Sequence, residues 1–189
     1  MTREIETVHL VLRPWRATDL DEYAHLLADP HVMRYVTHEY GPLSYEEAQQ
    51  AHARILRLWG ERGFGPWAAV EKTSGRWVGK IGLNHLDYWS GPDEIEVEWQ
   101  LNHPFWGKGY ATEGGRAGVQ YGFDELGLER IIAMTVPHHT ASRRIMEKCG
   151  LTYQGVVTVI DRRVHTERDL VWYAIDRFGW ESSRRSTQS

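Results

Sequence analysis

A short glycine-rich segment, Trp106-Gly107-Lys108-Gly109-Tyr110-Ala111-Thr112, stands between a predicted strand and a predicted helix. Glycines let the backbone turn tightly with several N–H groups directed outward, and a helix N-terminus adds about half a positive charge. Together these features bind a phosphate or pyrophosphate without a cage of side chains. We therefore expect the backbone from Gly107 to Thr112 to hold such a group, with the Lys108 ammonium as an added ion-pair partner.

Two common nucleotide-binding motifs do not fit this segment. A Walker A loop needs GxxxxGK followed by Ser or Thr, and a Rossmann fingerprint needs GxGxxG after the first strand of a parallel unit. Taken alone, a Gly-Lys-Gly turn is equally consistent with a plain connection from strand to helix. The segments on either side of the turn decide between the two interpretations.

The segment before the turn, from Glu94 to Leu101, alternates apolar with acidic or amide residues and predicts a strand with one acidic face. After the turn come a predicted helix to Leu126, a strand from Arg130 to Val136, and a helix from Thr140 to Cys149. Ser142 lies in the first turn of that last helix. A hydroxyl there stabilises negative charge as a hydrogen-bond donor, although an ordinary helix-start serine has the same position.

This order of segments resembles the GNAT acetyltransferases, in particular the branch that contains the Rim-type enzymes of ribosomal proteins. The opening Leu10-Val11-Leu12-Arg13-Pro14 and the later Asp29-Pro30-His31-Val32-Met33 are similar to the same branch. The resemblance spans almost the whole chain. It implies an α/β fold whose central, mostly antiparallel sheet has about seven strands, a splayed central strand pair and flanking helices.

The resemblance also implies acetyl-CoA as the acyl donor, attacked directly in a ternary complex by a primary amine. The acceptor is a protein N-terminal α-amine or a small-molecule amine. Trp106 stands at the Gln or Arg position of the family's pyrophosphate-binding loop, and Gln100 and Leu101 match the strand end whose free backbone groups pair with the pantetheine arm. His139 replaces the usual Asn and is taken as a cofactor contact. Met146 replaces a Tyr acid, so the tyrosine-acid mechanism is not carried over.

Acetyl transfer to an amine requires an unprotonated amine and a stabilised thiolate. Glu96 and Glu98 are the candidates for the base, and Glu98 is preferred because it lies nearer the reactive end of its strand. The alternative is an acidic face that meets water or pairs with arginines. Ser142, or else His139, handles the thiolate. A CoA-binding module without chemistry and a plain interaction domain are competing functions, which thioester turnover and thermal shift by acyl-CoA would distinguish.

Further segments must position these residues. We expect a strand over Thr7 to Arg13, a helix after an N-cap at Thr18, and a helix to about Glu61 after a capping box of Ser44 and Glu47. A hairpin, a turn and a final strand pair follow, at residues 66–83, 90–93 and around 161–163. Loops from Tyr35 to Leu43 and near residues 161–165 are expected to determine the acceptor.

Length and composition limit the remaining choices. The 189 residues predict one domain over residues 1–181 and a disordered tail over 182–189. With 22 Lys and Arg against 26 Asp and Glu and no basic stripe, nucleic acid is not expected as a partner. No apolar run reaches the ~20 residues of a membrane span, and the lone Cys149 forms no internal disulfide, so we expect a cytoplasmic protein. No His, Cys and Asp cluster has the spacing of zinc ligands, so no metal is expected. A homodimer is left open.

Overall fold

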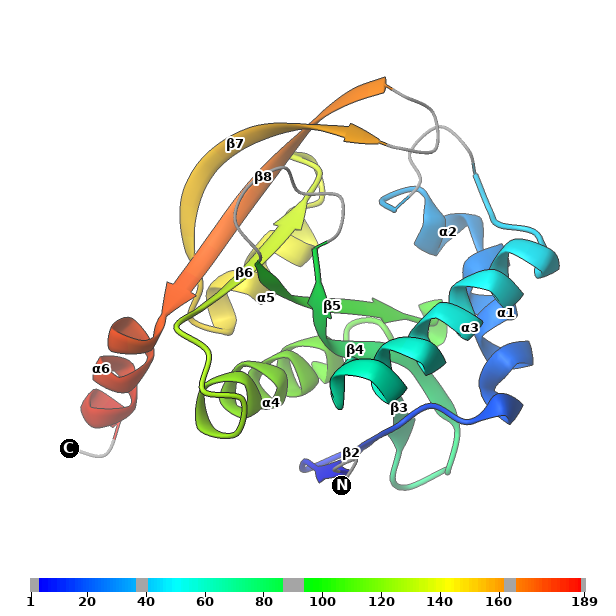
Figure 1. The fold of residues 1–189 in the computed structure, drawn as a ribbon, viewed down its shortest axis with the longest axis horizontal. Coiled ribbons are helices and arrows are strands. Elements are labelled where there is room, and N and C mark those ends of the chain that lie inside the picture. Colours follow the sequence, from blue (N-terminus) through cyan, green and yellow to red (C-terminus); the bar gives the residue numbers. More distant parts are fainter. Residues whose placement is uncertain (1–3, 37–40, 87–93, 162–165, 188–189) are drawn as a thin grey trace.

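The computed structural model of the chain describes residues 4–36, 41–86, 94–161 and 166–187 (Figure 1). Its strands are β1 (Ile5–Glu6), β2 (Leu10–Arg13), β3 (Pro66–Glu71), β4 (Trp77–His85), β5 (Ile95–Leu101), β6 (Arg130–Thr135), β7 (Thr152–Asp161) and β8 (Thr166–Asp176). Its α-helices are α1 (Leu20–Ala28), α2 (Pro30–Met33), α3 (Tyr45–Arg62), α4 (Tyr110–Asp124), α5 (Thr140–Lys148) and α6 (Arg177–Thr187), and short 3-10 turns cover Ala17–Asp19 and His103–Phe105. The expected turn at residues 90–93 and most of residues 161–165 lie outside the described residues.

The eight strands form one sheet in the order β1-β2-β3-β4-β5-β6-β8-β7. Every neighbouring pair is antiparallel except β5 and β6, which are parallel and share the single register pair Glu96 and Ile132. The two strands therefore separate beyond that pair. The predicted mixed sheet with a splayed central pair is confirmed, with eight strands where we expected about seven.

The additional strand arises at the N-terminus, where the expected strand from Thr7 to Arg13 is wrong at its start. The Thr7 N–H donates to the Leu10 carbonyl at 2.9 Å, which makes a tight turn, and Val8 at the turn is 80% exposed. Residues before and after this turn pair as β1 and β2. The apolar alternation continues through the turn, so it does not reveal the reversal.

Helices cover both faces of the sheet (Figure 1). On β4, Ile81 faces α4 so closely that a Cβ on Gly114 would lie 2.7 Å from its Cδ1 atom. This close approach explains why residue 114 of α4 is a glycine. The next residue back, Lys80, points to the opposite face, where α1 and α3 pack.

Local capping signals are confirmed at one helix and wrong at another. At α3 the Ser44 hydroxyl accepts from the Glu47 N–H at 3.3 Å, and the Glu47 carboxylate accepts from the Ser44 N–H at 2.8 Å. At α1 the expected cap Thr18 lies inside a 3-10 turn. Asp19 stands at the N-cap position of α1, but its side chain does not cap that helix. Its carboxylate instead accepts from the Arg16 N–H at 2.7 Å and from both terminal nitrogens of Arg13.

The C-terminal residues also differ from the expectation. Residues 182–187, assigned to a tail without structure, continue α6. This helix is attached to α4, because the Trp180 ring stacks on Phe123 at 4.9 Å and Arg184 lies 3.3 Å from Asp124. None of the helices in the described part of the chain combines the length and apolar character needed to cross a bilayer.

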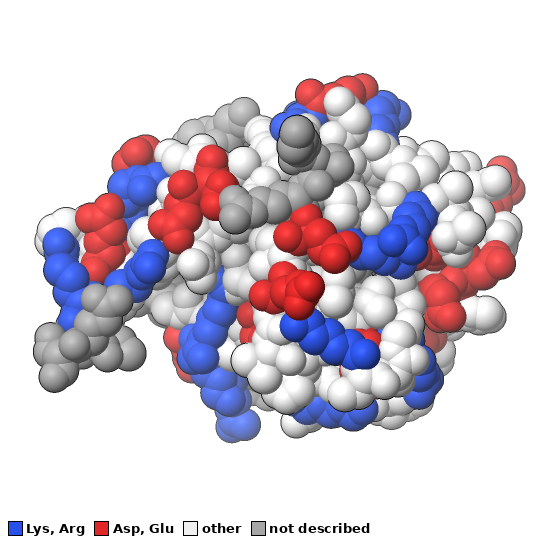
Figure 2. Space-filling view, turned by 90° about the horizontal axis from the view of Figure 1, so that it is seen from below, with Lys and Arg blue, Asp and Glu red and all other residues white. Residues whose placement is uncertain are grey.

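Charged residues of both signs are interspersed over the face of the molecule drawn in Figure 2. No continuous basic stripe crosses that face.

Candidate active site

A cavity of about 730 Å³ lies where β5 and β6 separate. It is lined by β5, the end of β6, the first turn of α4, one side of α5 along its length, the turn after α2 and parts of β4 and β8. Of the residues predicted from the sequence, all but Lys108 line this one cavity: Glu96, Glu98, Gln100, Leu101, Trp106, Gly107, Gly109, Tyr110, Ala111, Thr112, His139 and Ser142. The tertiary structure therefore brings the two candidate glutamates, the glycine loop and the serine helix together.

The glycine loop leaves open space in front of the N-terminus of α4. Gly107 and Gly109 have φ angles of +75° and +84°, and a Cβ added to either residue would meet nothing within 4 Å. Glycine adopts these left-handed angles without strain, and the bare backbone lets a ligand approach closely. The loop thus fits a pyrophosphate, since it combines free volume with the positive end of a helix of 15 residues.

The Lys108 side chain lies away from the cavity. Its Nζ atom is 3.4 Å from Glu71 Oε1 and 4.9 Å from the centroid of the Phe105 ring. In this position the Lys108 ammonium does not face the cavity, so it does not form the expected ion pair with a phosphate bound there. Two cations that sequence reasoning missed, Arg144 and Lys148, line the cavity from α5. Their spacing of four residues on one helix was the available signal, because it places them on the same face.

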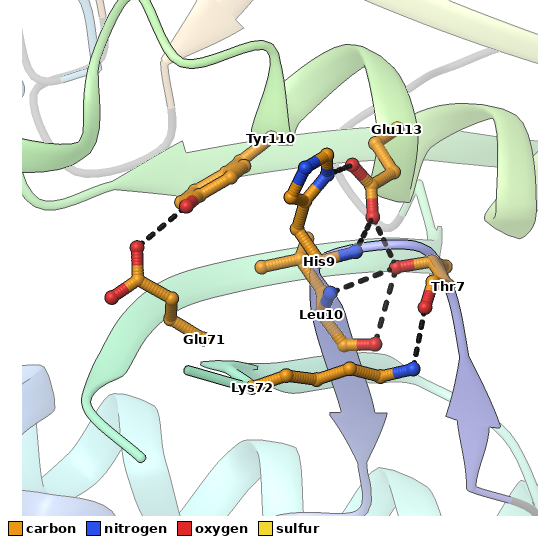
Figure 3. Close-up of polar contacts among 7 residues, drawn as sticks. All are labelled: Thr7, His9, Leu10, Glu71, Lys72, Tyr110 and Glu113. Atoms are coloured by element: carbon orange, nitrogen blue, oxygen red, sulfur yellow. Dashed lines mark hydrogen bonds and ion pairs between the residues drawn. The ribbon is translucent and has the colours of Figure 1, made fainter. Parts of the chain in front are cut away.

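Two carboxylates connect the first turn of α4 to β3 and to the turn between β1 and β2 (Figure 3). Glu71 accepts a hydrogen bond from the Tyr110 hydroxyl at 2.5 Å. Glu113 accepts from the Thr7 hydroxyl at 2.5 Å and from the His9 N–H at 2.7 Å. These hydrogen bonds join the first turn of α4, which directly follows the glycine loop, to the N-terminal part of the sheet. They therefore fix where the N-terminus of α4 lies relative to the sheet.

The acid dependence of stability should report on Glu71. Hydrogen bonds from Ser74 and Tyr110 and the charge of Lys108 lower the pKa of Glu71 from 4.5 to about 2. A lowered folded-state pKa gives stability that is fully present above the unfolded-state pKa and is lost as the pH falls through the folded one. We expect the melting temperature of the wild type to fall more steeply from pH 4.5 to pH 2 than that of Glu71→Gln.

Thermal denaturation across this pH range is the measurement. Glu22→Gln is the matched control, because Glu22 is an exposed glutamate on α1. Its curve should run parallel to that of the wild type. Equal acid dependence in the wild type and Glu71→Gln would contradict the assignment.

The backbone of β5 opens toward β6 at alternate residues. The Asn102 N–H donates to the Val78 carbonyl of β4 at 2.9 Å, so Gln100, two residues before it, also directs its backbone groups to β4. Trp99 and Leu101 direct theirs to the opening. Leu101 thus matches the expected pairing position for the pantetheine arm, whereas Gln100 contributes only its side chain to the cavity. The Leu101 carbonyl accepts from the Trp106 indole N–H at 2.8 Å.

The acidic face of β5 is buried rather than solvated. Glu94 forms an ion pair with Arg130, and Glu96 is only 7% exposed. Glu98 Oε2 lies 3.0 Å from the Nζ atom of Lys80, and among the described residues its buried Oε1 atom has no hydrogen-bond partner. Of the alternative stated for this face, pairing with arginine holds for Glu94, whereas Glu98 pairs with a lysine. A lone lysine within the apolar sequence of β4 was the signal for the buried pair.

Ser142 and His139 reach the cavity from the start of α5. Ser142 is 5% exposed, and His139 Nδ1 lies 3.1 Å from the Thr135 hydroxyl. The His139 ring stacks on Tyr35 with centroids 3.7 Å apart. Burial, followed by the positive charges of His138 and Arg34, lowers the pKa of His139 to about 4. The imidazole is therefore neutral at neutral pH, and it offers a hydrogen bond rather than an imidazolium acid.

No cluster of three or more His, Cys, Asp or Glu side chains able to hold a metal ion occurs among the described residues. Cys149 is buried, and burial raises the pKa of its thiol to about 12. The thiol is therefore protonated and inert, as expected for a small core residue.

Comparison with known proteins gives consistent matches. Residues 9–152 match the model of a family described as "Acetyltransferase (GNAT) domain". The FsC-acetyl coenzyme A-N(2)-transacetylase of Aspergillus fumigatus is 36% identical over 132 residues, which are 66% of this chain and 54% of that protein. The chain thus spans about half the length of this relative. The uncharacterized N-acetyltransferase YnaD of Bacillus subtilis is 26% identical over 93% of this chain and 98% of its own length.

Solved structures agree. A GNAT-family acetyltransferase from Bacillus anthracis superposes with a TM-score of 0.74 at 27% identity, covering 92% of this chain and 98% of that chain. A Vibrio cholerae protein provisionally named a ribosomal-protein-serine acetyltransferase has the same fold, with a TM-score of 0.74 at 17% identity over 93% of this chain and 99% of that chain. The match over residues 9–152 confirms the resemblance to the GNAT acetyltransferases.

Proposed function

The chain belongs to the GNAT acetyltransferases, and from that membership we propose that it transfers an acetyl group from acetyl-CoA to a primary amine by direct attack. One observation carries the proposal. A single cavity holds an open glycine loop at a helix N-terminus, a buried carboxylate oxygen without a described partner, and a buried serine at a second helix N-terminus. These are the groups that donor binding, amine deprotonation and thiolate stabilisation require.

The donor would bind through the backbone of this chain more than through its side chains. The N–H groups from Gly107 to Thr112 would hold the pyrophosphate, and the cations Arg144 and Lys148 lie at the same cavity. The open edge of β5 at Trp99 and Leu101 would pair with the pantetheine arm as an added strand does. Acetyl-CoA supplies the activated acyl group, and the residues of this chain orient it.

Proton handling would fall to Glu98 and Ser142. The acceptor ammonium gives one proton to Glu98, and the freed nitrogen lone pair then forms a bond to the acetyl carbon as the carbon–sulfur bond breaks. Sulfur leaves as a thiolate, to which the Ser142 hydroxyl donates a hydrogen bond. The new amide nitrogen then loses its second proton to solvent, and the thiolate takes up one proton from solvent. Glu98 returns its proton to solvent. A serine hydroxyl is too weak an acid to supply the proton itself.

The names of two similar proteins support the proposed acceptors. The Aspergillus protein is named as an FsC-acetyl coenzyme A-N(2)-transacetylase, and the Vibrio protein is provisionally named for a ribosomal protein. Both a small-molecule amine and a protein N-terminal α-amine are therefore proposed acceptors. An α-amine has a pKa near ~8 against ~10.4 for lysine, so it needs less help to lose its proton. Release of CoA from acetyl-CoA with a panel of small amines and N-terminal peptides tests the proposal, and no release with any of them would contradict it.

Ser142→Ala should lower turnover more than it weakens acetyl-CoA binding. The proposed hydrogen bond strengthens as the thiolate forms, and a bond to a charged group contributes about 1.5–3 kcal/mol. We expect kcat to fall roughly 10- to 100-fold, since each 1.4 kcal/mol is tenfold. Calorimetry should give an acetyl-CoA Kd within about threefold of the wild type.

Thr140→Ala is the matched control, because Thr140 is exposed in the same turn of α5 and does not line the cavity. Thr140→Ala should leave kcat and the acetyl-CoA Kd near their wild-type values. A normal kcat for Ser142→Ala with weakened acetyl-CoA binding would instead make Ser142 a residue that positions the donor.

A further inference from the structure

A buried lysine lies directly against the proposed base. Lys80 comes from β4, where its backbone pairs with that of Gln100 on β5. Its Nζ atom is 3.0 Å from Glu98 Oε2, and the two side chains are only 12% and 21% exposed. Buried ion pairs are costly to desolvate and stabilise a fold little, if at all, over apolar residues of the same size. A role beyond stability is therefore indicated.

The pair leaves one carboxylate oxygen unused. Lys80 occupies Glu98 Oε2, whereas Oε1 is buried and has no hydrogen-bond partner in the described part of the chain. Both residues line the cavity between β5 and β6. Buried carboxylate oxygens are normally satisfied, and one that is not calls for an external donor. An ammonium or amine nitrogen is a donor of matching charge.

The groups around the pair keep Lys80 charged. Tyr23 from α1 is buried beside it, Glu96 on β5 acts on Lys80 through its charge, and Arg54 on α3 acts on Tyr23. Burial alone would lower the pKa of Lys80, but the charge of Glu98, Tyr23 and Glu96 raises it overall, so Lys80 stays an ammonium. Lys80 therefore stays paired with one oxygen of Glu98, and the other oxygen, Oε1, is the open acceptor on this wall of the cavity.

We propose that Lys80 is a positioning residue that holds Glu98 through Oε2 and presents Oε1 to the acceptor, making an ammonium subsite in the wall of the cavity. This inference rests on the proposed function, in which Glu98 accepts the proton of the amine. Lys80 fixes the direction of the carboxylate. The substrate class that fits is an amine that arrives protonated.

Lys80→Met tests this role, because methionine keeps the apolar stem and removes the ammonium. Without its partner, the buried Glu98 carboxylate should have a higher pKa, by about one to three pH units. The acidic limb of kcat/KM should move to higher pH by the same amount, with a raised acceptor KM and an acetyl-CoA Kd within about twofold. Lys80→Arg, which keeps the cation, should retain the limb within about half a pH unit of the wild type.

Two comparisons separate positioning from a merely structural role. In a Glu98→Gln background, Lys80→Met should lower the rate by less than about twofold, because Lys80 acts through Glu98. Arg184→Met, which removes a cation from the exposed pair with Asp124, should leave the pH profile unchanged. A structural role would lower the melting temperature of Lys80→Met without moving the acidic limb, and equal losses in both backgrounds would overturn the proposal.

A readout without turnover keeps this inference distinct from the proposed function. The carboxyl carbon of Glu98 in protein labelled with carbon-13 glutamate, assigned by its loss in Glu98→Gln, reports the pKa directly by NMR titration. A raised pKa in Lys80→Met supports the inference even if no tested amine is acetylated. An unchanged pKa overturns it even if the wild type is an active acetyltransferase.

Discussion

Glu98→Gln is expected to lower the rate of acetylation about 100-fold at neutral pH and to recover most of that loss two to three pH units higher. At neutral pH the acceptor is largely an ammonium ion, and the amide has the shape of the carboxylate but cannot take a proton. At high pH, solvent supplies the free amine, so the need for a base disappears. The pH–rate profile with an acceptor that turns over is the measurement.

Glu96→Gln measured beside it is the matched control, because Glu96 lies on the same face of β5 and lines the same cavity. Glu96→Gln should lower the rate of acetylation less than Glu98→Gln does if Glu98 is the base. Glu98→Gln also leaves Lys80 without its anion, so the melting temperature and the acetyl-CoA Kd must be measured too. A loss independent of pH would indicate a structural role. Wild-type profiles in both variants would mean that water or the substrate itself removes the proton.

Gly109→Val is expected to weaken acetyl-CoA binding by about tenfold or more. Gly109 has a φ of +84°, where a β-branched residue is strained by about 1–3 kcal/mol. The free loop should relax to another conformation, and binding must then restore the original one. The added side chain would also project into the open space where the pyrophosphate is expected. Calorimetry with CoA measures the effect.

Gly127→Val is the matched control. Gly127 also has a positive φ, of +66°, and a Cβ there would also meet nothing within 4 Å, but it does not line the cavity. Both variants should lose similar stability, and only Gly109→Val should lose CoA affinity. Unchanged affinity in Gly109→Val would remove the pyrophosphate from this loop.

Local sequence determines much of this fold, because its signals act over a few residues. The capping box at Ser44, the glycine that ends α3 and the alternation of β5 each depend on neighbours in the chain. These features could be predicted from the sequence for that reason. The same alternation failed at Thr7, where a hydrogen bond to Leu10 reverses the chain without changing the apolar pattern.

For the candidate site, the sequence supplied the residue types and their order along the chain. Glycine at two left-handed positions and serine in the first turn of a helix are local requirements, so the loop from Gly107 to Thr112 and Ser142 were found without coordinates. The direction of the Lys108 side chain could not be found from the sequence. Its ammonium lies near Glu71, 37 residues earlier in the chain, and no pattern within the loop indicates that attraction.

Tertiary structure alone decided which polar side chains meet. Glu113 is bonded to Thr7, 106 residues away, and Glu98 pairs with Lys80 only because the register of β4 and β5 places them on one face. Burial follows from packing of α1 and α3 on that face, and burial turns an acidic stripe into an ion pair with one open oxygen. Charge and hydrogen bonding act through space, whereas the sequence specifies only distance along the chain.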